Sequence, residues 1–223
     1  MIEILYEDNH LIAVNKNSGD IVQQDKTGDT PLSTFVKAYI KKKYKKPGEV
    51  FLGTIHRLDR PTSGIVLFAR TSKALRRMNE QFKNQKIQKT YWAIVNKMPP
   101  NNSGTLSNIL QKDEKKNKSF ITKKVEGKLA ILNYKLLKKL DKYYHLEIKP
   151  KTGRHHQIRV QLANIGCIIK GDLKYGAKRS NKDASIHLLA QKLEFIHPVT
   201  QQQISIIARP PKDNVWQACN QLL

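Results

Sequence analysis

Short connections between strand-like segments are the feature that most limits how this sequence can fold. Apolar segments at residues 2–6 and 11–15 are separated by the turn residues Asp8-Asn9, and residues 195–198 and 204–208 are similarly close. Parallel neighbouring strands need a crossover of about a dozen residues or more. These pairs are therefore predicted to be antiparallel hairpins.

Segments with helical periodicity lie between the strands. Thr30-Pro31 predicts an N-cap followed by proline at the first helical position, and Pro47-Gly48 is expected to end that helix. Its predicted apolar face consists of Leu32, Phe35, Val36, Tyr39 and Ile40. A second helix is expected after a cap at Thr71 or Ser72. A third should follow residues 152–153, with Ile158, Leu162 and Ile165 on one face.

The remaining segments predict more strands. Residues 64–69 form a continuous apolar run typical of a buried strand, and residues 90–95 and 129–137 are also strand-like. Residues 144–149 alternate, which places His145 on the solvent side, and residues 101–119 predict a surface loop or weak hairpin. Together these elements predict the α+β class, with a mixed, largely antiparallel central sheet flanked by helices in one domain spanning residues 1–223.

The charge balance indicates a polyanionic partner. Lysine and arginine number 41 against 18 acidic residues, which gives a formal net charge of +23. Such a surplus favours nucleic-acid binding, with an affinity that falls as salt rises. Runs such as residues 41–43 and 45–46 also fit a merely solvated lysine face. Charge alone therefore leaves both interpretations open and does not distinguish DNA from RNA.

Other features predict a cytoplasmic protein without a metal site. The first ten residues are acidic and strand-like, unlike a secretory signal, and the longest apolar run is too short to span a bilayer. Cys167 and Cys219 have no metal-ligand spacing and are expected to be reduced thiols. The adjacent pair His155-His156 cannot face one metal ion from a helix.

The segment from His56 to Gly64 has the densest set of chemically useful residues. Asp59 is flanked by Arg57 and Arg60, close before the buried run that starts at Gly64. Cations on both sides would keep a carboxylate ionised in an enzyme site. An aspartate in such a context also fits simple turn capping, so the residue types by themselves leave both roles open.

Four ordered blocks make the sequence similar to one enzyme family. HRLDRPTSGIVLFAR resembles the signature segment of RluA-type pseudouridine synthases, and ILYEDNHLIAVNKNSGDIV resembles their N-terminal block. Lys89-Thr90-Tyr91 resembles their Lys-any-Tyr motif. The stretch YHLEIKPKTGRHHQIRVQLANIGCIIKGDLKYG resembles their third motif with the usual Gly-Asp and Tyr-Gly, here Gly171-Asp172 and Tyr175-Gly176. The closing EFIHPVTQQQ also fits. These blocks cover nearly the whole chain.

The resemblance implies an RNA-modifying isomerase with an active-site cleft across the sheet. It implies that Asp59 is the nucleophile, that Tyr91 stacks on the uracil, and that Arg159 pairs with the aspartate. Ile158 is implied to line the base pocket, and Arg57 and Arg60 to contact phosphate or support the flipped base. By position alone, Arg159 also fits an ordinary surface arginine.

The resemblance also carries expectations about partners. The substrate is expected to be ribosomal or transfer RNA, with no cofactor and no membrane, and the default expectation is a monomer. Because the catalytic blocks begin at residue 2, no separate N-terminal RNA-binding domain is expected. Departures from the family pattern are Asn17 in place of proline, Cys167-Ile168 in place of His-Pro, and Leu189 where histidine is common.

Two other functions compete with a synthase. One is a non-catalytic RNA-binding protein with the same fold. The intact set of Asp59, Tyr91 and Arg159 counts against it. The other is a DNA-binding protein selected by charge alone, which lacks a helix-turn-helix or zinc pattern.

Overall fold

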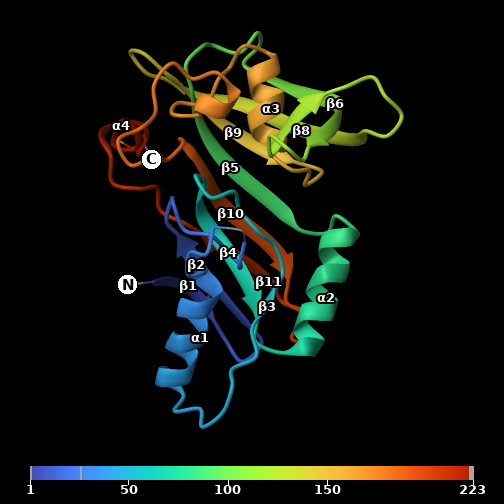
Figure 1. The fold of residues 1–223 in the computed structure, drawn as a ribbon, viewed down its shortest axis with the longest axis vertical. Helices are drawn as coiled ribbons and strands as arrows, with labels where there is room; N and C mark the ends of the chain where they lie inside the picture. The colour runs from blue at the N-terminus through green and yellow to red at the C-terminus, as the bar shows by residue number, and fades with distance from the viewer. Residues whose placement is uncertain (1, 26, 221–223) are drawn as a thin grey trace. The chain divides into compact units, whose positions relative to one another are not determined.

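The computed structural model describes residues 2–25 and 27–220, and their fold is α+β as predicted (Figure 1). The chain divides into two compact units. The first comprises Met1–Gln88 and Ala190–Pro210, and the second comprises Lys89–Leu189 and Pro211–Leu223. All strand pairs described below are antiparallel.

The first unit is built on the strands that the short connections predict. β1 (Glu3–Glu7) pairs with β2 (Leu11–Lys16), and β2 pairs with β4 (Ser63–Ala69), which also carries the two-residue β3 (Gly53–Thr54). β10 (Leu188–Ile196) pairs with β11 (Gln203–Ile207), which confirms the expected hairpin near the end of the chain. All seven residues of β4 are buried, as the continuous apolar run indicates.

Helix α1 (Leu32–Lys43) covers one face of this sheet but differs from its prediction at both ends. Its cap position is Pro31, not Thr30, and the amides of Leu32 and Ser33 donate to the carbonyl oxygens of Ile21 and Val22. Those backbone acceptors replace a cap side chain. The helix ends at Lys43, before Pro47-Gly48.

The apolar face of α1 is also narrower than predicted. Leu32, Val36 and Ile40 are buried against strand residues such as Val14 and Val66. Phe35 was expected on this face but is 50% exposed. The stripe that packs on the sheet is therefore the i, i+4 row alone, with Tyr39 partly covered at its edge.

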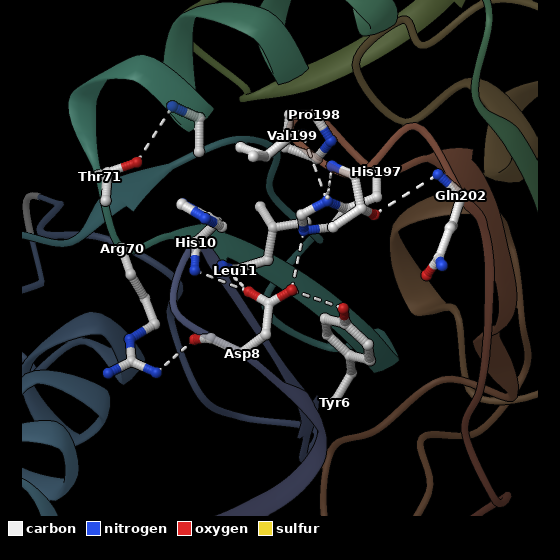
Figure 2. Close-up of polar contacts among 12 residues, drawn as sticks. Tyr6, Asp8, His10, Leu11, Arg70, Thr71, His197, Pro198, Val199 and Gln202 are labelled. Carbon is white, nitrogen blue, oxygen red and sulfur yellow. Dashed lines mark hydrogen bonds and ion pairs between the residues drawn. The ribbon is translucent and has the colours of Figure 1, made fainter.

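A polar network joins the β1–β2 turn to the β10–β11 turn (Figure 2). Asp8 accepts hydrogen bonds from the Tyr6 hydroxyl at 2.6 Å and from the amides of His10 and Leu11 at 2.7 Å each. The Nε2 atom of buried His197 lies 2.8 Å from Asp8 Oδ2, at ion-pair distance but without hydrogen-bond alignment. His197 Nδ1 accepts from the amides of residues 199 and 200. The network fixes both turns at the same end of the first unit.

Helix α2 (Ser72–Lys83) begins as predicted. The Thr71 side chain is its N-cap and accepts from the Ala74 amide at 3.2 Å. Ala74 and Met78 are buried, whereas Arg76 is exposed. Arg77 is half-buried and donates to the carbonyl oxygen of Pro198 at 2.6 Å.

The second unit is a five-stranded sheet with a helix packed on it. Its strand order is β5-β9-β8-β6-β7, and the bounds are β5 Gln88–Val95, β6 Ser103–Asp113, β7 Lys118–Ile121, β8 Lys128–Lys139 and β9 Tyr144–Pro150. Of the two alternatives for residues 101–119, the hairpin is correct. β6 pairs with both β7 and β8, so it is a full member of the sheet.

Helix α3 (Gln157–Asn164) is buried on more sides than its apolar stripe predicts. Every residue from Gln157 to Leu162 is buried. Gln161 Nε2 donates to the carbonyl oxygens of Leu106 and Ala130, and Gln157 Nε2 donates to that of Ile131. The Nε2 donors of both glutamines thus dock the helix on carbonyl oxygens of β6 and β8, whereas Gln161 Oε1 is buried without a hydrogen-bond partner.

Helix α4 (Asn214–Asn220), which the sequence did not predict, follows the β10–β11 hairpin. Trp216 of α4 lies edge-on to His145, with ring centroids 6.2 Å apart. This contact and Trp92 bury His145, whose predicted solvent-side position is therefore wrong. Burial and Lys138 lower the pKa of His145 to about 4. Cys167 and Cys219 are both buried free thiols, as expected.

None of the helices found among residues 2–25 and 27–220 has the length and apolar character needed to cross a bilayer.

Candidate active site

Asp59 lies on a loop of the first unit that is anchored to the core. The Thr62 amide donates to the Asp59 carbonyl at 3.0 Å, and Gly19 N donates to the Arg60 carbonyl at 2.9 Å. The hydroxyl of Ser18 donates to the Pro61 carbonyl at 3.2 Å. The half-buried Asp59 side chain is therefore carried by a backbone held from both sides.

The start of β4 holds the other end of this loop. Gly64 has a φ of +112°, and a Cβ atom there would lie 2.3 Å from the backbone oxygen of Ala190. Only glycine fits both the conformation and the space. The close approach of two strands thus fixes where the Asp59 loop leaves the sheet.

Lys16 is a part of this site that the residue patterns did not reveal. Its side chain is fully buried at the end of β2, and Nζ donates to the carbonyl oxygens of Asn17 at 2.8 Å and Arg60 at 3.0 Å. Burial lowers the pKa of Lys16 to about 8, while the charges of Asp20 and Asp59 oppose that shift. The buried ammonium therefore interacts electrostatically with Asp59 and binds the loop that carries it.

The two arginines beside Asp59 point to solvent. Arg57 is exposed, and Arg60 is 46% exposed at its side chain and forms a surface ion pair with Asp29 at 2.6 Å. Exposed guanidinium groups next to a carboxylate suit contact with a phosphate backbone. The structure thus places all three candidates of this segment, Arg57, Asp59 and Arg60, on one loop.

Tyr91 and Ile158 lie in the second unit and share one core cluster. Tyr91 is half-buried on β5, where it pairs with Ile148 of β9, and it packs against the cluster that contains Ile158 of α3. Lys89 is two residues earlier on the same face of β5, and burial lowers the pKa of this lysine. An aromatic ring at the rim of an apolar cluster is a suitable platform for an unstacked base.

Arg159 is a buried cation, so it is not an ordinary surface arginine. Its side chain is 5% exposed, and Asp172 binds it through two parallel hydrogen bonds. Arg159 Nε donates to Asp172 Oδ2 at 2.7 Å, and Nη2 donates to Oδ1 at 2.8 Å. This bidentate geometry is the strongest form of an arginine–carboxylate contact. The second residue of the pair, Asp172, belongs to the Gly-Asp pair of the third family block but was not among the predicted site residues.

The face of the same guanidinium is covered by Tyr175. The Arg159 Cζ atom lies 5.1 Å from the centre of the Tyr175 ring. The Tyr175 hydroxyl contacts His156 Nδ1 at 2.9 Å and donates to the Ser119 carbonyl at 3.1 Å. Burial and the charge of Arg159 lower the pKa of His156 to about 2, so this imidazole is neutral at physiological pH.

The charged groups of the site do not form a metal centre. In the part of the chain that the structure describes, no three His, Cys, Asp or Glu side chains are grouped as metal ligands would be. The side chains His155 and His156 stack on each other with ring centroids 3.8 Å apart.

Comparison with known proteins identifies the family of the chain. The family model described as RNA pseudouridylate synthase matches residues 10–164. The chain is 36% identical to "tRNA pseudouridine synthase C" of Vibrio vulnificus over 97% of its own length and 93% of the relative's. It is also 36% identical to "Ribosomal large subunit pseudouridine synthase C" of Buchnera aphidicola, over 92% of its length and 66% of the relative's.

The fold has relatives of solved structure. "Human RNA Pseudouridylate Synthase Domain Containing 4" superposes with a TM-score of 0.80 over 96% of this chain and 90% of that one, at 23% identity. The human "Domain Containing 1" protein superposes with a TM-score of 0.76 over 98% and 87%, at 22% identity. These two structural similarities show a shared fold.

The chain therefore belongs to the RNA pseudouridylate synthase family. It is an isomerase that acts on RNA, as the ordered motifs predicted.

Proposed function

We propose that this enzyme converts specific uridines of transfer or ribosomal RNA to pseudouridine, with Asp59 as the nucleophile. Two relatives carry names that specify transfer RNA and large-subunit ribosomal RNA respectively, which supports both substrate classes. The observation that carries the assignment of residues is the burial of Arg159 in a bidentate pair. A guanidinium that is buried and held in one orientation on α3 suits a catalytic carboxylate as a further partner.

The chemistry is an isomerisation and needs no net oxidation or reduction. The bond from ribose C1′ to uracil N1 breaks, the base turns, and a bond forms from C1′ to C5. The hydrogen on C5 leaves as a proton, and N1 gains a proton. A base in folded RNA has to be flipped out of its stack to reach a carboxylate.

The resemblance to the family supplies the proposed role of each residue. Asp59 attacks the substrate from the anchored loop, Tyr91 stacks on the flipped uracil, and Arg159 pairs with the carboxylate. Ile158 lines the base pocket with apolar surface. Arg57 and Arg60 contact phosphate or support the flipped conformation, which their exposure permits.

Exposed basic residues of the first unit supply sequence-independent binding. They lie on α1 and just after it, and on α2, and comprise Lys37, Lys41, Lys42, Lys43, Lys45, Lys46, Lys73 and Arg76. We propose that this monomeric enzyme works in the cytoplasm on RNA held by such contacts.

Release of tritium tests both the activity and the substrate class. Purified protein would be incubated separately with transfer RNA and ribosomal RNA labelled with tritium at C5 of uridine. We expect tritium release from one of them, and mapping of pseudouridine in RNA from cells with and without the gene then names the site. Binding of RNA without tritium release from either class would instead support the non-catalytic RNA-binding alternative.

A further inference from the structure

A cavity of about 370 Å³ lies in the first unit, lined by the loop that joins α1 to β3 and by the residues that follow β4. The loop contributes Tyr44, Lys46, Glu49 and Phe51, and the end of β4 contributes Arg70. Sites for small ligands have volumes of about 300–1,000 Å³, so this cavity has room for one base with its phosphate. None of these five residues belongs to the candidate active site.

Arg70 brings a buried positive charge to the wall of this cavity. Its side chain is 9% exposed, and Nη1 donates to the Asp8 carbonyl (Figure 2). The same atom contacts the Tyr44 hydroxyl at 3.3 Å and Glu7 Oε1 at 3.4 Å. Among residues 2–25 and 27–220, the Nε and Nη2 atoms of Arg70 meet no hydrogen-bond acceptor. A guanidinium on a cavity wall with N–H groups in this state suits a phosphate.

Phe51 places an exposed aromatic ring on the same wall. It is 48% exposed, and a single exposed phenylalanine is ordinary on a protein surface, so its neighbours decide what the ring means. The Tyr44 ring already packs under the Arg70 guanidinium, with Cζ 4.4 Å from the ring centre. In the part of the chain that the structure describes, no other ring or cation stacks on Phe51. An exposed ring beside a cation can stack on an unpaired base of any type.

The charges around the cavity favour a nucleotide over other ligands. Lys46 lines it, and the exposed lysines Lys41, Lys42 and Lys45 precede it in the chain. This concentration of positive charge attracts the phosphates of RNA. The Glu49 carboxylate would repel an isolated phosphate, but its oxygens can accept from the N–H groups of a base. Base and phosphate together therefore fit the cavity better than a phosphate alone.

The cavity lies at the opposite end of β4 from the catalytic loop. Asp59 precedes the first residue of β4, Ser63, whereas Arg70 follows the last, Ala69. A strand rises about 3.3 Å per residue, so the seven residues of β4 separate the two sites by about 23 Å. Stacked nucleotides advance about 3.4 Å each, so about seven of them span this distance.

We propose that this cavity binds one unpaired nucleotide of the substrate RNA, about seven nucleotides from the modified uridine. Phe51 stacks on the base, Arg70 and Lys46 bind its phosphate, and Glu49 accepts from its N–H groups. The inference rests on the proposed function for the identity of the RNA, but the contact itself needs no catalysis. Its effect is on affinity for the RNA, because the cavity is remote from the reacting atoms.

Binding of a short RNA tests the site apart from the reaction. Dye-labelled penta-adenylate is the probe, since it contains no uridine for the active site, and fluorescence anisotropy gives its affinity. Phe51→Ala should bind it about 5–150-fold more weakly, because stacking on one base is lost. Phe35→Ala is the matched control, since Phe35 is 50% exposed on α1 but does not line the cavity, and it should keep the wild-type affinity. Equal affinities for wild type and Phe51→Ala would overturn the proposal.

Phe51→Leu separates stacking from apolar packing. Leucine keeps most of the apolar surface but has no aromatic face, so this variant should unfold like wild type and bind penta-adenylate about as weakly as Phe51→Ala. Wild-type affinity for Phe51→Leu would overturn the proposal. The same comparison decides the matter if Phe51→Ala does not fold.

Two competitors separate the nucleotide from other occupants. Inorganic phosphate and hexaglutamate carry negative charge but have no base to stack on Phe51. Each should displace labelled penta-adenylate much less effectively than unlabelled penta-adenylate does. If either competes as well as the RNA, charge alone governs the binding, and the cavity is not a nucleotide site.

Substrate length links the cavity to the reaction. On full-length RNA, Phe51→Ala should need a higher enzyme concentration than wild type for half-maximal tritium release. This difference should shrink on a fragment with fewer than about seven nucleotides on each side of the target. A defect of equal size on both RNAs would overturn the remote contact.

The outcomes distinguish this inference from the proposed function. Tritium release by wild type, together with binding that does not depend on Phe51, would refute the cavity site alone. Binding that depends on Phe51, without tritium release from either RNA class, would refute the proposed function and leave the cavity as an RNA-binding site.

Discussion

Stability should rise between neutral and alkaline pH because of the buried Lys16. Its pKa is about 8 in the folded protein against an ordinary value of 10.5. Between these two values the unfolded chain binds a proton that the folded chain does not, so the free energy of unfolding increases with pH. At 1.36 kcal/mol per pKa unit, the gap corresponds to about 3 kcal/mol. Most of it, about 2–3 kcal/mol, is gained between pH 7 and pH 10.

Lys16→Met isolates this contribution because methionine keeps most of the apolar stem and has no charge. Other lysines titrate in the same range, so the informative quantity is the difference in unfolding free energy between wild type and variant at each pH. Wild type should gain about 2–3 kcal/mol relative to the variant from pH 7 to pH 10.

Urea unfolding followed by circular dichroism is the suitable assay. Both tryptophans, Trp92 and Trp216, lie in the second unit, so their fluorescence would report the wrong part of the chain. A difference that stays constant from pH 7 to pH 10 would refute the reasoning, because it would mean that Lys16 keeps its proton as easily when folded as when unfolded.

Four further outcomes are expected. Gly64→Ala should destabilise the protein by about 2–4 kcal/mol in a urea titration, because the position has a positive φ and the new Cβ would clash with backbone. Gly53→Ala should lower the free energy of unfolding by less, because its Cβ would meet a leucine side chain. Burial alone would raise the pKa of Asp8, but hydrogen bonds from Tyr6 and two amides outweigh it and lower that pKa below 3.8. The free energy of unfolding should therefore fall as pH drops through this lowered value. Asp8→Asn should remove that loss in an acid titration. Arg159→Ala should be nearly inactive and should also lose about 3–5 kcal/mol of stability, because it leaves the carboxylate of Asp172 buried without its partner, and calorimetry together with tritium release would measure both effects. RNA affinity should fall with salt, with a slope of about −0.7 in log–log form per neutralised phosphate of a single-stranded segment, and a flat profile would exclude the basic helices as the binding surface.

Local sequence signals predicted the elements that carry the site. The apolar run of β4, the Thr71 cap of α2 and the alternation in β9 each indicated the element that is observed. The ordered motifs identified Asp59, Tyr91 and Arg159 as candidates, and their proposed roles remain predictions.

Features that depend on packing were not predictable in this way. Lys16 follows a run of apolar strand residues, yet nothing local shows that the chain closes over its ammonium. Asp172 lies thirteen residues from Arg159 and joins it only because the loop after α3 turns back. The seven-residue α4 is too short for a clear helical period, and without it the burial of His145 could not be foreseen.

The most direct test of the account is the activity of Asp59→Asn on RNA that the wild-type enzyme modifies. Asp20→Asn is the matched control, since both carboxylates act on the charge of Lys16. We expect Asp59→Asn to bind the RNA and unfold like wild type but to release no tritium from C5-labelled uridine, while Asp20→Asn remains active. Substantial tritium release by Asp59→Asn would contradict the assignment of Asp59 as the nucleophile.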